Sequence, residues 1–183
     1  YMDDDIYRIC VSGSHAKENP FQHYLDFLYE LGELSEDEQK LYEGIGREFI
    51  QTIETTEMQK VYKMPILYSF YNHGNIRIAV TDEEVLESWK EFFDTGTNWK
   101  DFPNVNTYED YRKVTDKQHL SKAKRMPIRF LKASGKGFFV EKDGYALALR
   151  DEIGDVVGNM AFGEQMGDVL GYRSLEYYRR RYE

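Results

Sequence analysis

The sequence predicts an α+β fold, built as one mostly helical domain with one short strand and a β-hairpin in its C-terminal half. Helix-start signals outnumber strand signals, and each pairs a capping side chain with a Glu or Gln three residues later. These pairs are Asn19 with Gln22, Ser35 with Glu38, Thr81 with Glu84 and Thr115 with Gln118. Against them stand one alternating apolar segment at 75–80 and one hairpin pattern at 138–149. We therefore expect a helix-rich core without a large sheet.

Periodic apolar residues and these caps place the individual elements. We expect helices over 20–31, 35–53, 65–72, 81–93, 107–114, 115–125, 127–131 and 160–182. Pro65 and Pro127 each begin a helix in this interpretation, because proline lacks the N–H that a helix interior needs. Segment 94–106, rich in Asn, Gly, Thr and Asp, is predicted to be a loop. Asp143-Gly144 favours a type I′ turn in the hairpin, since such a turn needs positive φ at both central residues.

The domain is expected to cover residues 20–183, after a flexible or loosely packed segment at 1–19. A chain of 183 residues is long enough to bury a core. Apolar stripes predict which side chains fill it. The residues expected to be mostly buried are Tyr24, Leu28, Phe49, Ile66, Phe70, Trp89, Phe93, Leu131 and Val169.

The composition of the chain bears on where in the cell the protein is expected. No apolar run approaches 18 residues and no signal-peptide pattern opens the sequence, so we expect neither a membrane partner nor secretion. Cys10 is the single cysteine, which excludes an internal disulfide and fits a cytoplasmic protein. The chain begins with Tyr1 rather than Met, and we expect a piece of something longer.

Motifs for catalysis are missing from the sequence. The four histidines, His15, His23, His73 and His119, have no metal-ligand spacing to one another or to Cys, and are expected on loops or helix surfaces. No glycine-rich run ends in Lys-Ser or Lys-Thr, so a phosphate-cradling loop is excluded. We therefore expect no enzyme activity, no metal and no cofactor.

Charge is distributed unevenly along the chain. The net charge is −9, and residues 1–60, with 14 acids and 5 bases, account for all of it. Residues 81–111 hold 9 acids and 2 bases, whereas 112–136 hold 9 bases and 1 acid. Clustered cations are what phosphate binding needs, because neutralising phosphates releases counterions. The candidate nucleic-acid-binding residues are Lys117, Lys122, Lys124, Arg125, Arg129, Lys132 and Lys136.

The basic stretch allows two interpretations. Helical spacing places Lys122, Arg125 and Arg129 on neighbouring turns of one side, provided that Pro127 only bends the path. Nearby aromatic residues at 130, 138 and 139 would then stack on unpaired bases. Alternatively, Phe130 and Leu131 belong to the core, and the lysines form a solvated face opposite the acidic segment at 81–111.

Three blocks of the sequence resemble one protein family. They are Lys63-Met-Pro-Ile-Leu-Tyr-Ser-Phe-Tyr-Asn-His-Gly-Asn-Ile with Trp89-Lys-Glu-Phe-Phe93, then Arg125-Met-Pro-Ile-Arg-Phe-Leu-Lys132 with Phe138-Phe139, and Leu175-Glu-Tyr-Tyr-Arg-Arg-Arg-Tyr182. Together they resemble the C-terminal accessory region of large bacterial superfamily 2 helicases of the DEAD/DEAH type, which are related to type III restriction subunits. The resemblance implies a region that follows the two motor lobes. None of the family's ATPase residues has a counterpart here.

The leading hypothesis is thus a non-catalytic C-terminal accessory domain of a bacterial DEAD/DEAH-type helicase. Its expected partners are nucleic acid, bound weakly and as DNA, and the motor lobes of the parent helicase. The alternative is a stand-alone protein-interaction or structural module with no nucleic-acid role. A small stand-alone enzyme ranks last, since no catalytic constellation is found.

Overall fold

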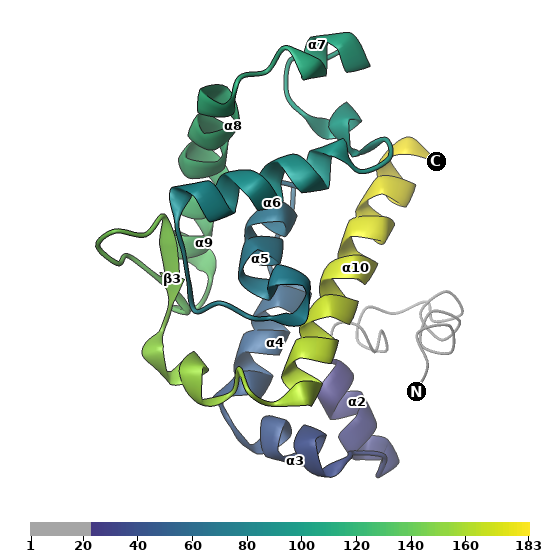
Figure 1. The fold of residues 1–183 in the computed structure, drawn as a ribbon. Helices are drawn as coiled ribbons and strands as arrows, with labels where there is room; N and C mark the ends of the chain where they lie inside the picture. The colour runs from purple at the N-terminus through teal and green to yellow at the C-terminus, as the bar shows by residue number, and fades with distance from the viewer. Residues whose placement is uncertain (1–22) are drawn as a thin grey trace.

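Three helices form the centre of the fold: α4 (Ile45–Thr55), α5 (Lys63–Tyr71) and the long C-terminal α10 (Met160–Tyr182). The computed structural model describes residues 23–183, and α10 packs against both α4 and α5 in it (Figure 1). Helix α6 (Asp82–Asp94) crosses α5 and makes the most extensive helix–helix contact of the described part. The mostly helical α+β fold is confirmed.

The other elements surround this centre. Helices α2 and α3 lie at one end of the molecule and α7 lies at the opposite end (Figure 1). Their bounds are α2 (Tyr24–Leu31), α3 (Glu36–Glu43), α7 (Tyr108–Arg112), α8 (Asp116–Ala123), the π-helical turn η4 (Lys124–Ile128), α9 (Arg129–Ser134) and the 3₁₀ turns η2 (Asn72–Gly74), η3 (Asn98–Asp101) and η5 (Asp151–Asp155). Turn η3 falls in a segment where we expected only a loop.

The short strand and the hairpin join in one small antiparallel sheet. Strand β3 (Leu147–Leu149) lies between β1 (Ala79–Val80) and β2 (Phe139–Val140). Its neighbour β1 comes from the segment predicted as an isolated strand, which therefore has a partner. The sheet is small, as the scarcity of strand signals predicted.

The type I′ prediction for the hairpin turn is wrong. Val140 pairs with Ala148, so a loop of several residues, rather than two, separates β2 from β3. Within it, Gly144 has a φ of +82° while Asp143 stays outside the left-handed region. A type I′ turn needs positive φ at both positions. The loop closes instead through a bond from the Tyr145 N–H to the Lys142 carbonyl, at 3.1 Å.

The capping boxes at Ser35, Thr81 and Thr115 all form, with both reciprocal hydrogen bonds in place. The helix expected over 35–53, however, is two helices that meet at Gly44, whose φ of −119° and ψ of −171° are extended. Gly46 lies where this corner brings α4 close to the side chain of Leu41, and a Cβ would collide with it. Gly44 and Gly46 thus allow the break between α3 and α4.

Neither proline begins a helix. Pro65 is the third residue of α5, where a backbone N–H has no helical partner to lose. Pro127 lies inside a continuous helical path over 116–134, and the path widens there into the π-helical turn η4. Such a turn makes i→i+5 hydrogen bonds, so side chains after it are rotated relative to those before it.

The predicted core is confirmed for eight of its nine members, each at most 2% exposed. The side chain of Tyr24, the helix start at Asn19-Pro20 and the expected loose segment at 1–19 lie outside the described residues. Trp89 is fully buried, and its ring packs against Tyr62, Phe93 and Phe102.

A buried carboxylate, Asp101, ties the end of α10 to two distant segments. It accepts hydrogen bonds from the Val61 N–H at 3.3 Å, the Tyr177 hydroxyl at 2.8 Å and the Tyr182 hydroxyl at 3.0 Å. The Arg181 Nε lies 3.0 Å away and supplies an opposite charge. Burial and the bond to Asp101 raise the pKa of Tyr177, so its hydroxyl remains a donor. A carboxylate that is 1% exposed needs such partners to compensate for its lost hydration.

Replacing Asp101 with Asn removes the charge and one set of acceptor lone pairs, while the side-chain size is preserved. We expect Asp101→Asn to lower the free energy of unfolding by about 2–3 kcal/mol, since bonds to a charged group are lost. Amide exchange at residues 177–182 should accelerate. The exposed Asp143→Asn serves as the control, and similar stability of both variants would contradict this role.

Candidate nucleic-acid interface

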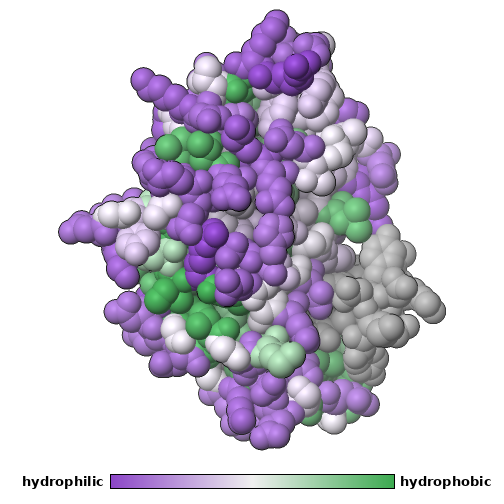
Figure 2. Space-filling model, in the orientation of Figure 1, coloured by the Kyte–Doolittle hydropathy of each residue, from purple (hydrophilic) through white to green (hydrophobic). Residues whose placement is uncertain are grey.

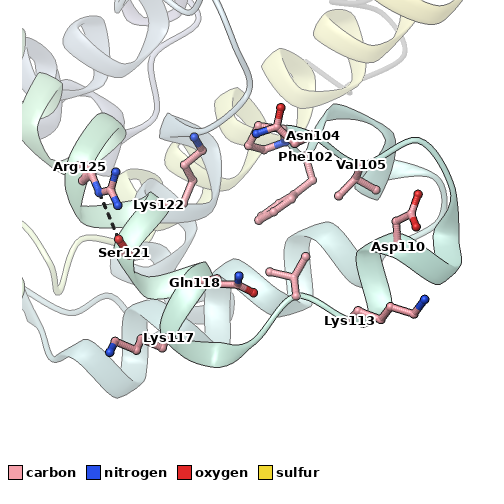
Figure 3. A pocket seen from close by; sticks show the side chains of 12 residues that line it. Phe102, Asn104, Val105, Asp110, Lys113, Lys117, Gln118, Ser121, Lys122 and Arg125 are labelled. Atoms are coloured by element: carbon pink, nitrogen blue, oxygen red, sulfur yellow. Dashed lines mark hydrogen bonds between the residues drawn. The ribbon is translucent and has the colours of Figure 1, made fainter.

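An open groove of about 600 Å³ lies between α8 and the segment that leads from η3 through α7 (Figure 3). It is bounded by basic, polar and apolar side chains. These are Phe102, Pro103, Asn104, Val105, Asp110, Lys113, Val114, Lys117, Gln118, Ser121, Lys122 and Arg125. We call it the basic groove.

Four cations surround the basic groove. Lys117 and Lys122 come from α8, Arg125 comes from the turn η4 after it, and Lys113 follows α7. Figure 3 shows the Phe102 ring in the middle of the groove with the basic residues around its edge. With Asp110 as the single acid of the lining, the groove carries a charge of +3.

Two sets of hydrogen bonds hold the α8 side of the groove in place. The Thr115 capping box fixes the first turn of α8, and the Arg125 Nε donates a hydrogen bond to the Ser121 hydroxyl at 3.2 Å. Asp110 is held at the opposite side, where its carboxylate accepts from the Thr107 N–H at 3.3 Å. Both walls of the groove are therefore anchored by helix caps.

Of the seven candidate residues, Lys117, Lys122 and Arg125 line the groove. Lys124 instead forms an ion pair with Asp82 at 2.6 Å, on α6. Arg129 begins α9 after the π-helical turn and is not among the residues that line the groove, so it does not join Lys122 and Arg125 there.

The two candidates beyond α8 also lie outside the lining. Lys132 pairs with Glu141 at 2.9 Å, next to the hairpin. Lys136 is exposed and adopts a left-handed φ of +53° in the turn after α9. The basic stretch is therefore split between the groove and other surfaces.

The expected stacking aromatics are not at the groove. Phe138 and Phe139 are buried, at 2% and 3% exposure, and both pack on Phe49. Phe130 is exposed but lines a different cavity, together with Met126. The alternative that assigned Phe130 and Leu131 to the core is confirmed for Leu131, which is 1% exposed, and wrong for Phe130.

Two residues of the groove, Lys113 and Phe102, were not predicted from the sequence as site residues. Lys113 belongs to the same basic run but precedes the Thr115 cap, so the α8 pattern did not include it. Phe102 was part of a presumed loop, yet it is only 7% exposed and packs edge-on against Tyr111 and Phe93. A signal was available for Lys113 in the charge count over 112–136; none was available for Phe102.

His119 lies beneath the groove rather than on the surface, so that expectation is wrong. Its ring is 3% exposed and packs edge-on against Phe102 and Tyr111. The Trp89 Nε1–H donates to His119 Nδ1 at 3.2 Å, which requires that nitrogen to be unprotonated. Burial, with the nearby charge of Lys90, lowers the pKa of His119.

Outside the groove, we examined the described residues for a metal site and for a membrane-spanning helix. His73 is exposed and forms a pair with Glu91 at 3.2 Å, without a third ligand. Within 23–183, no set of three or more His, Cys, Asp or Glu side chains is placed to hold a metal ion. None of the described helices combines the length and the apolar character needed to cross a bilayer.

Replacing His119 with Asn keeps an acceptor near the position of Nδ1 and removes the titratable ring. The folded state of the parent lowers this pKa below its usual 6.5, so the unfolded state binds more protons in acid. The stabilisation is present above pH 6.5 and is lost as the pH falls through the folded-state pKa. We expect the free energy of unfolding, from urea titrations, to fall less steeply below that pH in His119→Asn.

Equal slopes in the parent and in His119→Asn would show that the buried ring does not titrate against stability.

Comparisons with protein-family models, curated proteins and solved structures find no match to this chain. The geometry of the basic groove and the sequence blocks described above are therefore the basis for a functional proposal.

Proposed function

We propose that this chain is a non-catalytic nucleic-acid-binding module and that the basic groove is its contact surface. The observation that carries the proposal is the grouping of Lys113, Lys117, Lys122 and Arg125 around one depression with a single opposing carboxylate. Cations gathered in a concave site attract a phosphate backbone more strongly than the same cations dispersed over a surface.

Binding is expected to be weak. The chain as a whole carries −9, so long-range repulsion of a polyanion opposes the local attraction of the groove. Affinity should therefore fall in the non-specific range of about 10⁻⁴ to 10⁻⁶ M and should decrease with salt. The groove offers Gln118 and Asn104 as its neutral polar side chains, which gives little scope for reading a base sequence.

The sequence resemblance supplies a context for this module. As a C-terminal accessory region of a bacterial DEAD/DEAH-type helicase, it would grip DNA beside the motor lobes and dock against them in the cytoplasm. The ATPase and unwinding steps would belong to the motor lobes, since this chain contains no phosphate loop. What supports this context is the likeness of the three sequence blocks.

A protein-interaction module is the second candidate, and specific surfaces favour it. Met160 and Leu175 on α10 are 71% and 63% exposed. Figure 2 shows hydrophilic side chains over most of one face and apolar ones gathered below the hairpin. Exposed apolar surface of this kind is suited to a protein partner.

Neutralising two groove cations tests the proposal. We expect the double variant Lys122→Gln with Arg125→Gln to weaken binding of a labelled DNA strand about tenfold or more in fluorescence anisotropy at low salt. The slope of log K against log salt should decrease by about 1.4 to 1.8, since each lost phosphate contact contributes about 0.7 to 0.9.

The matched control is Arg129→Gln with Lys136→Gln, which removes the same charge outside the groove. It should bind nearly as the parent does. If both double variants lose the same affinity for DNA, binding depends on net charge and not on the groove. If the parent does not bind DNA, the protein-interaction module becomes the better candidate.

A further inference from the structure

We infer that the basic groove takes an unpaired nucleic-acid strand in preference to a duplex, with phosphates on the α8 side and base faces over its apolar floor. This inference rests on the proposed function and specifies its ligand. The observation behind it is the division of the groove lining into a charged edge and an apolar centre.

The charged edge follows a helix. Lys117 and Arg125 are eight residues apart on the continuous path of α8 and η4, which corresponds to about 12 Å along the helix axis. Lys122 lies between them and has no carboxylate partner among its hydrogen bonds or ion pairs in the described residues. This row has the length of a few phosphates rather than of an extended track.

The floor is apolar. Phe102 lies at its centre, and the half-buried side chains of Val105 and Val114 flank it (Figure 3). All three pack on the core below, so they cannot withdraw when a ligand arrives. An unpaired base has two apolar faces that can cover such a floor, and stacking or apolar contact of this kind tolerates any base.

A duplex cannot use this floor. Its base faces are stacked inside the helix, and only groove edges and phosphates are exposed. Reading a duplex groove requires a helix or strand that protrudes into it, whereas this surface is recessed. A duplex would therefore meet the cations but would leave the half-buried Val105 and Val114 uncovered. Asp110, on the wall opposite α8, would also face the second strand of a duplex.

Three labelled probes separate these contributions in anisotropy titrations at low salt. They are an oligothymidine, an abasic strand of the same length and charge, and a duplex of the same length. We expect the oligothymidine to bind about tenfold tighter than the abasic strand, the equivalent of one stacked base. It should also bind more tightly than the duplex, although the duplex has twice the phosphates.

A variant of the apolar floor tests the contact with bases separately from the contact with phosphates. Val114→Thr is nearly isosteric and leaves every charge in place, so it should reduce oligothymidine binding while leaving the abasic strand unaffected. Leu175→Thr makes the same kind of change on exposed α10 and should alter neither.

The outcomes distinguish the two proposals. If the abasic strand or the duplex binds as tightly as the oligothymidine, the strand preference is overturned and the basic groove remains a plain phosphate site. If none of the probes binds, the proposed function fails and the inference fails with it.

Discussion

The buried carboxylate of Asp101 is the interaction on which the arrangement of this molecule depends. It joins the segment before α5, the turn η3 and the end of α10, and the backbone carbonyl of Asp101 accepts a further bond from Tyr62 at 2.9 Å. Phe102 is the next residue in the chain. The same bonds that hold the C-terminal helix therefore also fix the position of the groove floor, because a 1% exposed carboxylate cannot move without losing its partners.

The second determinant is the helical path over 116–134. The path widens at Pro127 into the π-helical turn η4, and Arg129, the first residue of α9, is not among the residues that line the groove. Lys117, Lys122 and Arg125 line the groove, whereas Lys124 pairs with Asp82 on α6 and Lys132 pairs with Glu141 beside the hairpin. The fold thus gathers three cations of the basic stretch at the groove and places the others in ion pairs or on other surfaces.

Local signals in the sequence were sufficient for much of the fold. The capping boxes at Ser35, Thr81 and Thr115 and the stripe that buries Trp89 were predicted because each depends on residues within two turns. Asp101 and His119 were not predictable in this way, since their burial depends on partners far along the chain. For the same reason, three of the four basic residues of the groove were predicted from the sequence, whereas its aromatic floor was not.

The most direct test of the groove as the nucleic-acid contact is a chemical-shift titration of the ¹⁵N-labelled chain with an oligothymidine. We expect shift changes concentrated in residues 102–105 and 110–125, which form the groove. The amides of α9, of the hairpin and of the face that carries Glu87 and His73 should remain unmoved. Changes centred on α9 or on the arginines at the end of α10, with the groove silent, would contradict it.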